Sequence, residues 1–186
     1  MSGASNNTLR ITSGAMMQCS ALDVGYYNKA GKNTLELENG TFKTLMTPGS
    51  SNSPWAIFDR YQSAKNSELV IKGTNSYFYA AYATLSKVRY EIPAEGLVDA
   101  RKTNPVCRIG YMSGSPNSIA VDVDGECPKG KWMLMKWNTD STTSAETLIS
   151  RTSLTGSGAG RATLEAGDHE IYLKVKGTDG MMLIYR

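Results

Sequence analysis

The sequence predicts an all-β protein, built as an antiparallel β-sandwich. Short runs of alternating apolar and polar residues recur at intervals of about ten residues, which is typical of such sandwiches. The stretches between these runs are rich in turn-forming residues, and glycine alone contributes 18 of the 186 residues. No amphipathic helix longer than two turns is evident. The best helical candidate, segment 142–150, contains β-branched residues that weaken a helix.

Length and composition indicate a single domain. A chain of 186 residues and 20.2 kDa is close to the usual size of one domain, and 40% of its residues are hydrophobic. Residues 1–7 are polar and show no periodicity, so we expect a flexible arm there. Residues 8–186 are expected to form the sandwich. No internal repeat stands out.

The strongest local pattern predicts a hairpin. Two alternating runs, Thr34–Glu38 and 41–45, flank the dipeptide Asn39-Gly40. Asn-Gly at this place favours a type I′ turn, because both turn residues need positive φ. The pattern therefore predicts antiparallel pairing with Leu37 opposite Phe42.

Further strands are expected along the rest of the chain. Alternation predicts that Val88, Tyr90 and Ile92 point inward, and the same pattern recurs in segments 118–123 and 170–176. The other expected strands are 8–12, 55–61, 68–72, 77–82, 84–92, 106–112, 131–137, 147–150, 161–164 and 181–185.

Charge and sequence motifs argue against several functional classes. The net charge is +3, and the Lys and Arg residues are scattered, so no nucleic-acid partner is indicated. No stretch approaches the length of a transmembrane helix, so no membrane insertion is expected. Neither G-x-x-x-x-G-K nor G-x-G-x-x-G after a strand occurs, and no cofactor is expected. Cys19, Cys107 and Cys127 form no C-x-x-C pair. We expect three reduced thiols, with a bridge between Cys107 and Cys127 as the alternative.

Catalytic and metal sites are not predicted. His169, the single histidine, adjoins Asp168 and directly follows a turn, and no G-x-S-x-G motif exists to supply a nucleophile. We therefore interpret His169 as structural. Segment 122–126 contains Asp-x-Asp-Gly-Glu but lacks the further ligands of a calcium loop, so no metal is expected. Acids able to act in glycoside hydrolysis occupy outward strand positions or turns; they are Glu36, Glu91, Glu95, Glu165 and Glu170.

Aromatic clusters supply the candidate ligand-binding residues. Exposed aromatic faces can stack on sugar rings, and alternation points one face of Tyr77-Phe78-Tyr79 outward. The alternative is that the aromatic residues pack in the core of the sandwich. Trp132 and Trp137 are separated by an odd number of positions, so a regular strand exposes one of them. The candidates are Trp132, Trp137, Tyr77, Tyr79 and Tyr82, and Tyr26-Tyr27 forms a further cluster.

The C-terminal half, from about residue 77, resembles the galactose-binding-like jelly-roll domains found as carbohydrate-binding modules. The similar segments are 90–96 (Tyr-Glu-Ile-Pro-Ala-Glu-Gly), 119–125 (Ile-Ala-Val-Asp-Val-Asp-Gly) and 164–177, which contains Leu-Glu-Ala-Gly-Asp-His-Glu-Ile-Tyr-Leu. The resemblance implies a jelly roll in which His169 is structural. Leu183 stands near the place where such modules carry a calcium-binding Asp, and connection 97–105 replaces a strand.

These observations favour a surface binding or assembly module and not an enzyme. The expected function is glycan binding, as a homo-oligomeric component of a phage or virus particle of the capsid-decoration or tail-fibre type. No signal peptide is visible, so we expect synthesis in the cytosol and a location on a virion or another exposed surface. The Met pairs 16–17 and 181–182 would then lie at interfaces with other virion proteins. The alternatives are a purely structural virion protein and a small carbohydrate-active enzyme.

Overall fold

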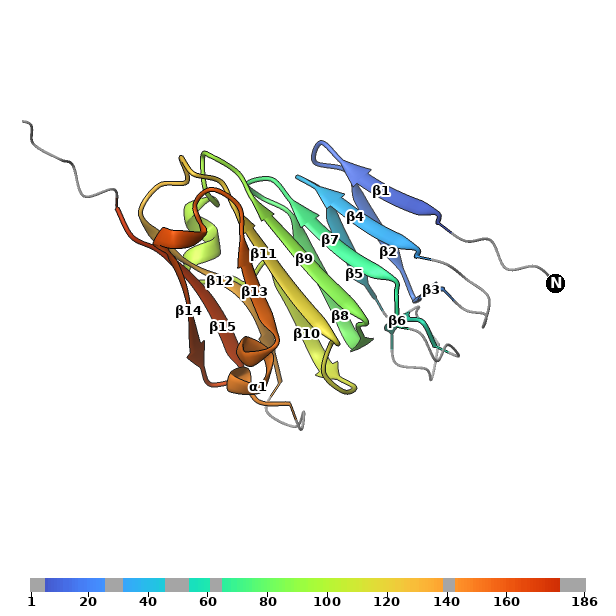
Figure 1. Ribbon diagram of the computed structural model, residues 1–186. Helices are drawn as coiled ribbons and strands as arrows, with labels where there is room; N and C mark the ends of the chain where they lie inside the picture. Colours follow the sequence, from blue (N-terminus) through green and yellow to red (C-terminus); the bar gives the residue numbers. More distant parts are fainter. Residues whose placement is uncertain (1–5, 26–31, 46–53, 61–64, 139–142, 178–186) are drawn as a thin grey trace, which may run out of the picture.

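The computed structural model describes residues 6–25, 32–45, 54–60, 65–138 and 143–177 (Figure 1). This part of the chain is mostly strand, with one short helix, α1 (Ala145–Ser150), and two 3-10 segments, η1 (Asp99–Lys102) and η2 (Ala159–Arg161). The strands are β1 (Thr8–Thr12), β2 (Met16–Cys19), β3 (Ala21–Val24), β4 (Thr34–Glu38), β5 (Thr41–Thr44), β6 (Trp55–Phe58), β7 (Glu68–Lys72), β8 (Tyr77–Thr84), β9 (Lys87–Ile92), β10 (Cys107–Met112), β11 (Ser118–Val123), β12 (Gly130–Trp137), β13 (Thr152–Thr155), β14 (Ala162–Gly167) and β15 (Glu170–Val175).

One sheet is entirely parallel. Its strand order is β1-β4-β7-β9-β11-β13. The chain leaves this sheet after each of these strands and returns to add the next one beside it, so the strands follow one another in sequence order. We call this sheet A. Its register stacks apolar positions into columns, as where Leu9, Leu35 and Leu69 lie side by side.

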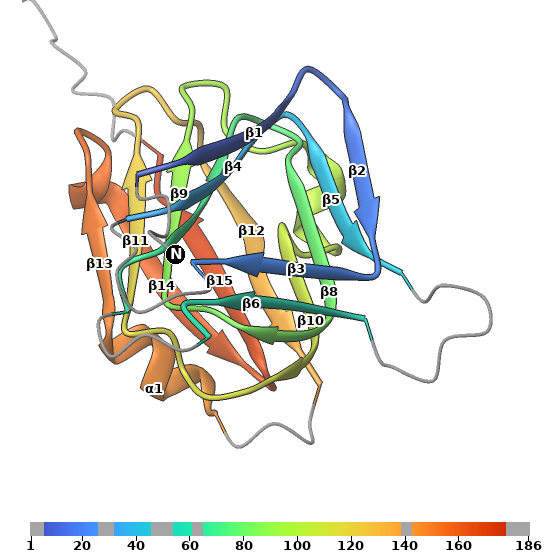
Figure 2. The same cartoon turned by 90° about the vertical axis from the view of Figure 1, so that its right-hand side faces the viewer.

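The second sheet, sheet B, is mixed. Strands β2, β5, β8, β10 and β12 pair in parallel in that order, and β15 and β14 then close the sheet by antiparallel pairing. A third flank forms where β3 pairs with β6 and β6 pairs with the second half of β8. Figure 2 shows that β1, β2 and β3 form three sides of one turn of the chain, which is its first coil.

This topology is a parallel β-solenoid, in which successive coils of the chain stack and each coil contributes strands to both sheets. The predicted antiparallel sandwich, and the jelly roll that the resemblance implied, are therefore wrong. The alternation on which they were based reports which face of a strand is buried, and it does not report the direction of the neighbouring strand.

The predicted Asn39-Gly40 hairpin is also wrong. Strands β4 and β5 lie in different sheets, and the dipeptide forms the corner between them. Asn39 adopts a φ of 53°, but Gly40 is not among the residues with positive φ, so the type I′ geometry is absent. The corner stacks on its neighbours instead. The Gly14 N–H donates to Asn39 O at 2.8 Å, and the Asn39 N–H donates to Lys72 O at 3.2 Å.

The inward-facing residues of the strands form one continuous core. The predicted inward set Val88, Tyr90 and Ile92 is at most 4% exposed. The alternating apolar residues of β11 and β15 are buried in the same way, which confirms the predicted orientation of these strands. A solenoid interior needs no long-range antiparallel partner, because every coil buries its apolar face against the coils on either side.

Several expectations fall wholly or partly outside the described residues. These are most of the N-terminal arm, Tyr26-Tyr27, the final strand 181–185 and the Met pair 181–182. The expected strand 147–150 is wrong, because these residues belong to α1, which lies within the helical candidate 142–150. The N-cap of α1, Ser144, accepts a hydrogen bond from Thr147 N–H. None of the helices in the described ranges combines the length and the apolar character needed to cross a membrane.

Candidate functional site

The tyrosines of β8 lie on two adjacent flanks of the solenoid. Tyr77 and Tyr79 point outward from sheet B and are half-buried. The inward-outward alternation changes after Ala80, so Tyr82 points outward from the next flank. There its ring stacks on that of Tyr111 in β10, with centroids 5.7 Å apart and an interplanar angle of 13°. The predicted cluster of three tyrosines is therefore divided by a corner of the coil.

Trp132 and Trp137 do not reach the surface. They are only 3% and 2% exposed, so the expectation that one would be exposed is wrong. The register of β12 against β15 shifts between Met133 and Met135, and this irregularity places both tryptophans on the inner face. The Trp137 indole N–H donates to Thr143 O at 3.0 Å within the core.

A groove of about 310 Å³ runs over the outer face of sheet B beside Tyr77. The connection that contains η1 forms one wall, and the outward side chains of β2, β5, β8 and β10 form the floor. We call it the basic groove; it is lined by Met16, Thr41, Lys43, Asn75, Tyr77, Ala100, Arg101, Asn104, Pro105 and Arg108.

Three cations surround the Tyr77 ring in the basic groove. Lys43 Nζ lies 5.8 Å from the ring centroid, and Arg101 Cζ lies 5.2 Å from it. Burial is the largest influence on the Tyr77 hydroxyl and raises its pKa, whereas the charges of Arg108 and Arg101 oppose that rise. The phenol is therefore a neutral hydrogen-bonding group at physiological pH.

Arg101 is fixed in place by its own hydrogen bonds. It is 8% exposed, and its guanidinium donates to Pro105 O at 3.3 Å and to Asn75 Oδ1 at 3.0 Å. Arg108 is exposed in the strand next to Tyr79. Among the residues that the structure describes, the lining of the groove includes no carboxylate. The described lining of the groove therefore combines three cations with an aromatic ring.

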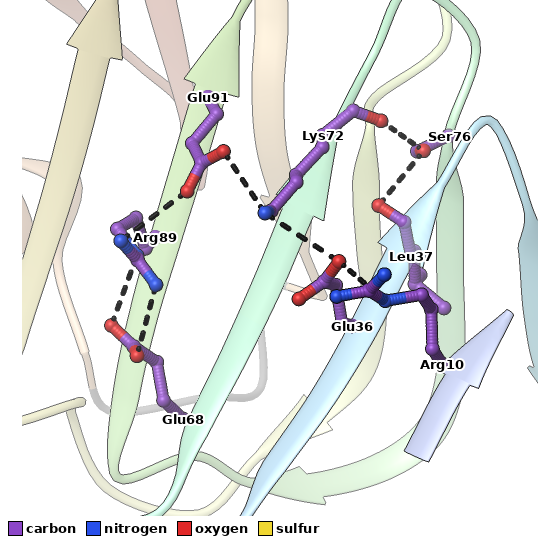
Figure 3. A network of polar contacts seen from close by, with 8 residues as sticks. All are labelled: Arg10, Glu36, Leu37, Glu68, Lys72, Ser76, Arg89 and Glu91. Carbon is purple, nitrogen blue, oxygen red and sulfur yellow. Dashed lines mark hydrogen bonds and ion pairs between the residues drawn. The ribbon is translucent and has the colours of Figure 1, made fainter. Parts of the chain in front are cut away.

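The outer face of sheet A has the opposite character, because its charges neutralise one another (Figure 3). Glu36 accepts ion pairs from Arg10 at 2.9 Å and from Lys72 at 3.5 Å. Lys72 also forms an ion pair with Glu91 at 3.3 Å. Arg89 forms ion pairs with both Glu91 and Glu68 at distances of up to 3.4 Å. This network links β1, β4, β7 and β9.

Sequence reasoning missed Lys43, Arg101 and Arg108. Lys43 lies far from the two arginines in the chain, and only the register of the coils brings Lys43, Tyr79 and Arg108 into one row across β5, β8 and β10. The outward position of Lys43 and Arg108 in alternating strands was the available signal.

Of the residues considered for catalysis and metal binding, Glu91, Glu95, Asp122 and Asp124 line one depression of about 950 Å³, and His169 lines a different one. His169 adopts a φ of 55° in the turn between β14 and β15, and its Nδ1 lies 2.7 Å from Asp168 Oδ1. Ser144 lines the same depression as His169, and its hydroxyl oxygen caps α1 by accepting a hydrogen bond from Thr147 N–H. Within the described ranges, no three His, Cys, Asp or Glu side chains cluster as metal ligands would. The three cysteines are unpaired, so the alternative of a Cys107–Cys127 bridge is not realised.

Comparison with known proteins gives no match: no family model, no curated protein and no solved structure is significantly similar to the chain.

Proposed function

We propose that the protein is a binding module that recognises an anionic polysaccharide along the basic groove. The observation that carries the proposal is the grouping of Lys43, Arg101 and Arg108 around Tyr77 without a carboxylate among the described lining residues. A uronate or sulfate group would accept charge-assisted hydrogen bonds from Lys43 and Arg108, and Arg101 would contribute its positive charge from the wall of the groove. The Tyr77 ring would lie against the apolar face of a sugar.

The periodicity of the solenoid supports an extended ligand. Lys43, Tyr79 and Arg108 occupy successive parallel strands in register. Neighbouring strands are about 4.8 Å apart, so the row spans roughly 10 Å across the coils. A linear polymer that lies across these strands would contact Lys43 on β5, the Tyr79 ring on β8 and Arg108 on β10 in turn.

Preorganisation of the groove also favours binding. Arg101 is held by hydrogen bonds to Pro105 and Asn75, so its guanidinium loses little freedom when a ligand arrives. Its neighbour Tyr77 is half-buried on the floor. Each such contact is worth little alone, and repetition along a polymer or between copies of the protein would strengthen attachment.

The test is affinity electrophoresis or calorimetry with polygalacturonate, with a neutral glucan as the comparison polymer. Arg108→Gln and Tyr77→Ala are each expected to weaken binding to polygalacturonate about tenfold. Arg151→Gln is the matched control, because it removes another exposed cation, after α1, that does not line the groove. Unchanged binding in both groove variants would contradict the proposal, and so would an equal loss in the control.

A further inference from the structure

A second and larger depression lies at the C-terminal end of sheet B. Its volume is about 860 Å³. The start of β12, the end of β15, η2 and the last residue of η1 form its walls. We call it the lysine pocket, after the six cationic side chains in its lining: Lys102, Lys129, Lys131, Arg161, Lys174 and Lys176. None of these residues lines the basic groove.

The strand register places like charges side by side in this pocket. Lys131 in β12 lies directly opposite Lys174 in β15. At the adjoining ends of the same strands, the side chain of Lys129 runs past Gly177, where an added Cβ would be 3.7 Å from Lys129 Cδ. Lys176 precedes that glycine and is exposed. Like charges in facing positions destabilise a sheet unless an anion compensates them.

Only part of this charge is compensated within the protein. Glu165 in β14 binds Lys131 at 2.6 Å and Lys174 at 2.9 Å, and these contacts lower its pKa to about 2. Lys129 and Lys176 have no ion-pair partner in the portion of the chain that the structure describes. The pocket therefore holds an excess of positive charge beside a carboxylate that remains ionised.

Arg161 shapes the pocket and is not free to donate to a ligand. Its guanidinium donates to Lys176 O at 2.9 Å and to Cys127 O at 3.0 Å, and it also contacts Gly125 O. These bonds tie η2 to the segments on both sides of the pocket, so they fix the backbone that carries Lys129 and Lys176. The lysines are left as the flexible donors.

We propose that the lysine pocket is a binding site for a multivalent oxyanion, of the phosphate or sulfate type. Lys129 and Lys176 would be its primary donors, with Lys131 and Lys174 contributing from the shared pair with Glu165. Charge-assisted contacts from several ammonium groups favour an anion that carries more than one charge. The site is separate from the basic groove, and the proposal does not depend on polysaccharide binding.

The experiment is calorimetric titration of the full chain with inorganic pyrophosphate, and in a second arm with inorganic sulfate, at constant ionic strength. The double variant Lys129→Gln/Lys176→Gln is expected to weaken binding of the preferred anion about tenfold. Arg151→Gln, at an exposed cation that lines neither the lysine pocket nor the basic groove, is the matched control and is expected to bind the anion as the wild type does. Circular dichroism of each variant establishes that the fold is retained.

Each outcome decides the proposal. Loss of pyrophosphate or sulfate binding in the double variant alone supports it, and the anion that binds more tightly identifies the group recognised. Failure of both anions to bind the wild type overturns it. An equal loss in Arg151→Gln also overturns it, because the effect would then come from the general positive charge of the protein. Polygalacturonate binding, measured on the same proteins, reports separately on the basic groove.

Discussion

An added Cβ atom at Gly40 would lie 2.4 Å from the carbonyl oxygen of Ile11, which belongs to the preceding coil. Real Cβ atoms do not approach backbone oxygens so closely, so glycine is required by the stacking of the coils and not by its own φ. Asn39-Gly40 is therefore a corner at which two coils touch.

The Gly40→Ala variant is expected to be less stable by about 1 to 3 kcal/mol, because the clash pushes the first coil away from the second. Chemical denaturation measures the change in the free energy of unfolding. Gly160→Ala is the control, since no atom lies within 4 Å of its added Cβ, and its stability should be close to that of the wild type. Equal stability of the two variants would show that the coils adjust without cost.

The sequence allowed the strands to be located, but not their partners. Alternation correctly oriented Val88, Tyr90 and Ile92, because burial on one side of a strand has the same pattern in any β fold. The coils have no fixed period that would reveal a solenoid. Thr34, Glu68 and Lys87 occupy equivalent positions in successive coils, yet they are 34 and then 19 residues apart.

The candidate site was predictable only in part for the same reason. Tyr77 and Tyr79 could be recognised as outward aromatic residues of one strand. Their neighbours Lys43 and Arg108 come from the coils before and after, and the register that aligns them depends on the lengths of the intervening corners. The two tryptophans were misplaced because a bulge in β12 reverses the alternation, and no feature of the sequence marks it.

The ion-pair network on sheet A is expected to contribute modestly to stability. Glu36→Gln removes the contacts to Arg10 and Lys72, and we expect a loss of about 1 kcal/mol at low salt, because both partners are partly exposed. The loss should shrink in 1 M NaCl, where the Debye length is about 3 Å. Glu126→Gln, at an exposed carboxylate outside the network, is the control. A loss that is independent of salt would indicate a packing effect instead.

The three thiols are expected to differ in reactivity. Cys107 is fully buried, and burial raises the pKa of its thiol to about 12, so almost no reactive thiolate is present or accessible near pH 8. Cys127 is also buried, whereas Cys19 in β2 is partly exposed. Titration of the native protein with a disulfide reagent should therefore show one faster thiol, and Cys19→Ser should remove that phase. Rapid reaction of Cys107 in the folded protein would contradict the buried position of β10.

The ion pairs of Glu165 with Lys131 and Lys174 predict how the stability of the folded protein depends on pH. Hydrogen bonds from Lys131 and Lys174 lower the pKa of Glu165 in the folded protein to about 2, from an ordinary value of 4.5. A lowered pKa means that the folded state favours the ionised carboxylate. This contribution is therefore complete above about pH 5 and is lost as the pH falls from there toward 2.

The melting temperature of Glu165→Gln should lie below that of the wild type at pH 6, and the two values should converge near pH 2. Because the side chain is at the surface, the difference should also decrease with salt, and a constant difference across this pH range would exclude the proposed role of the two lysines.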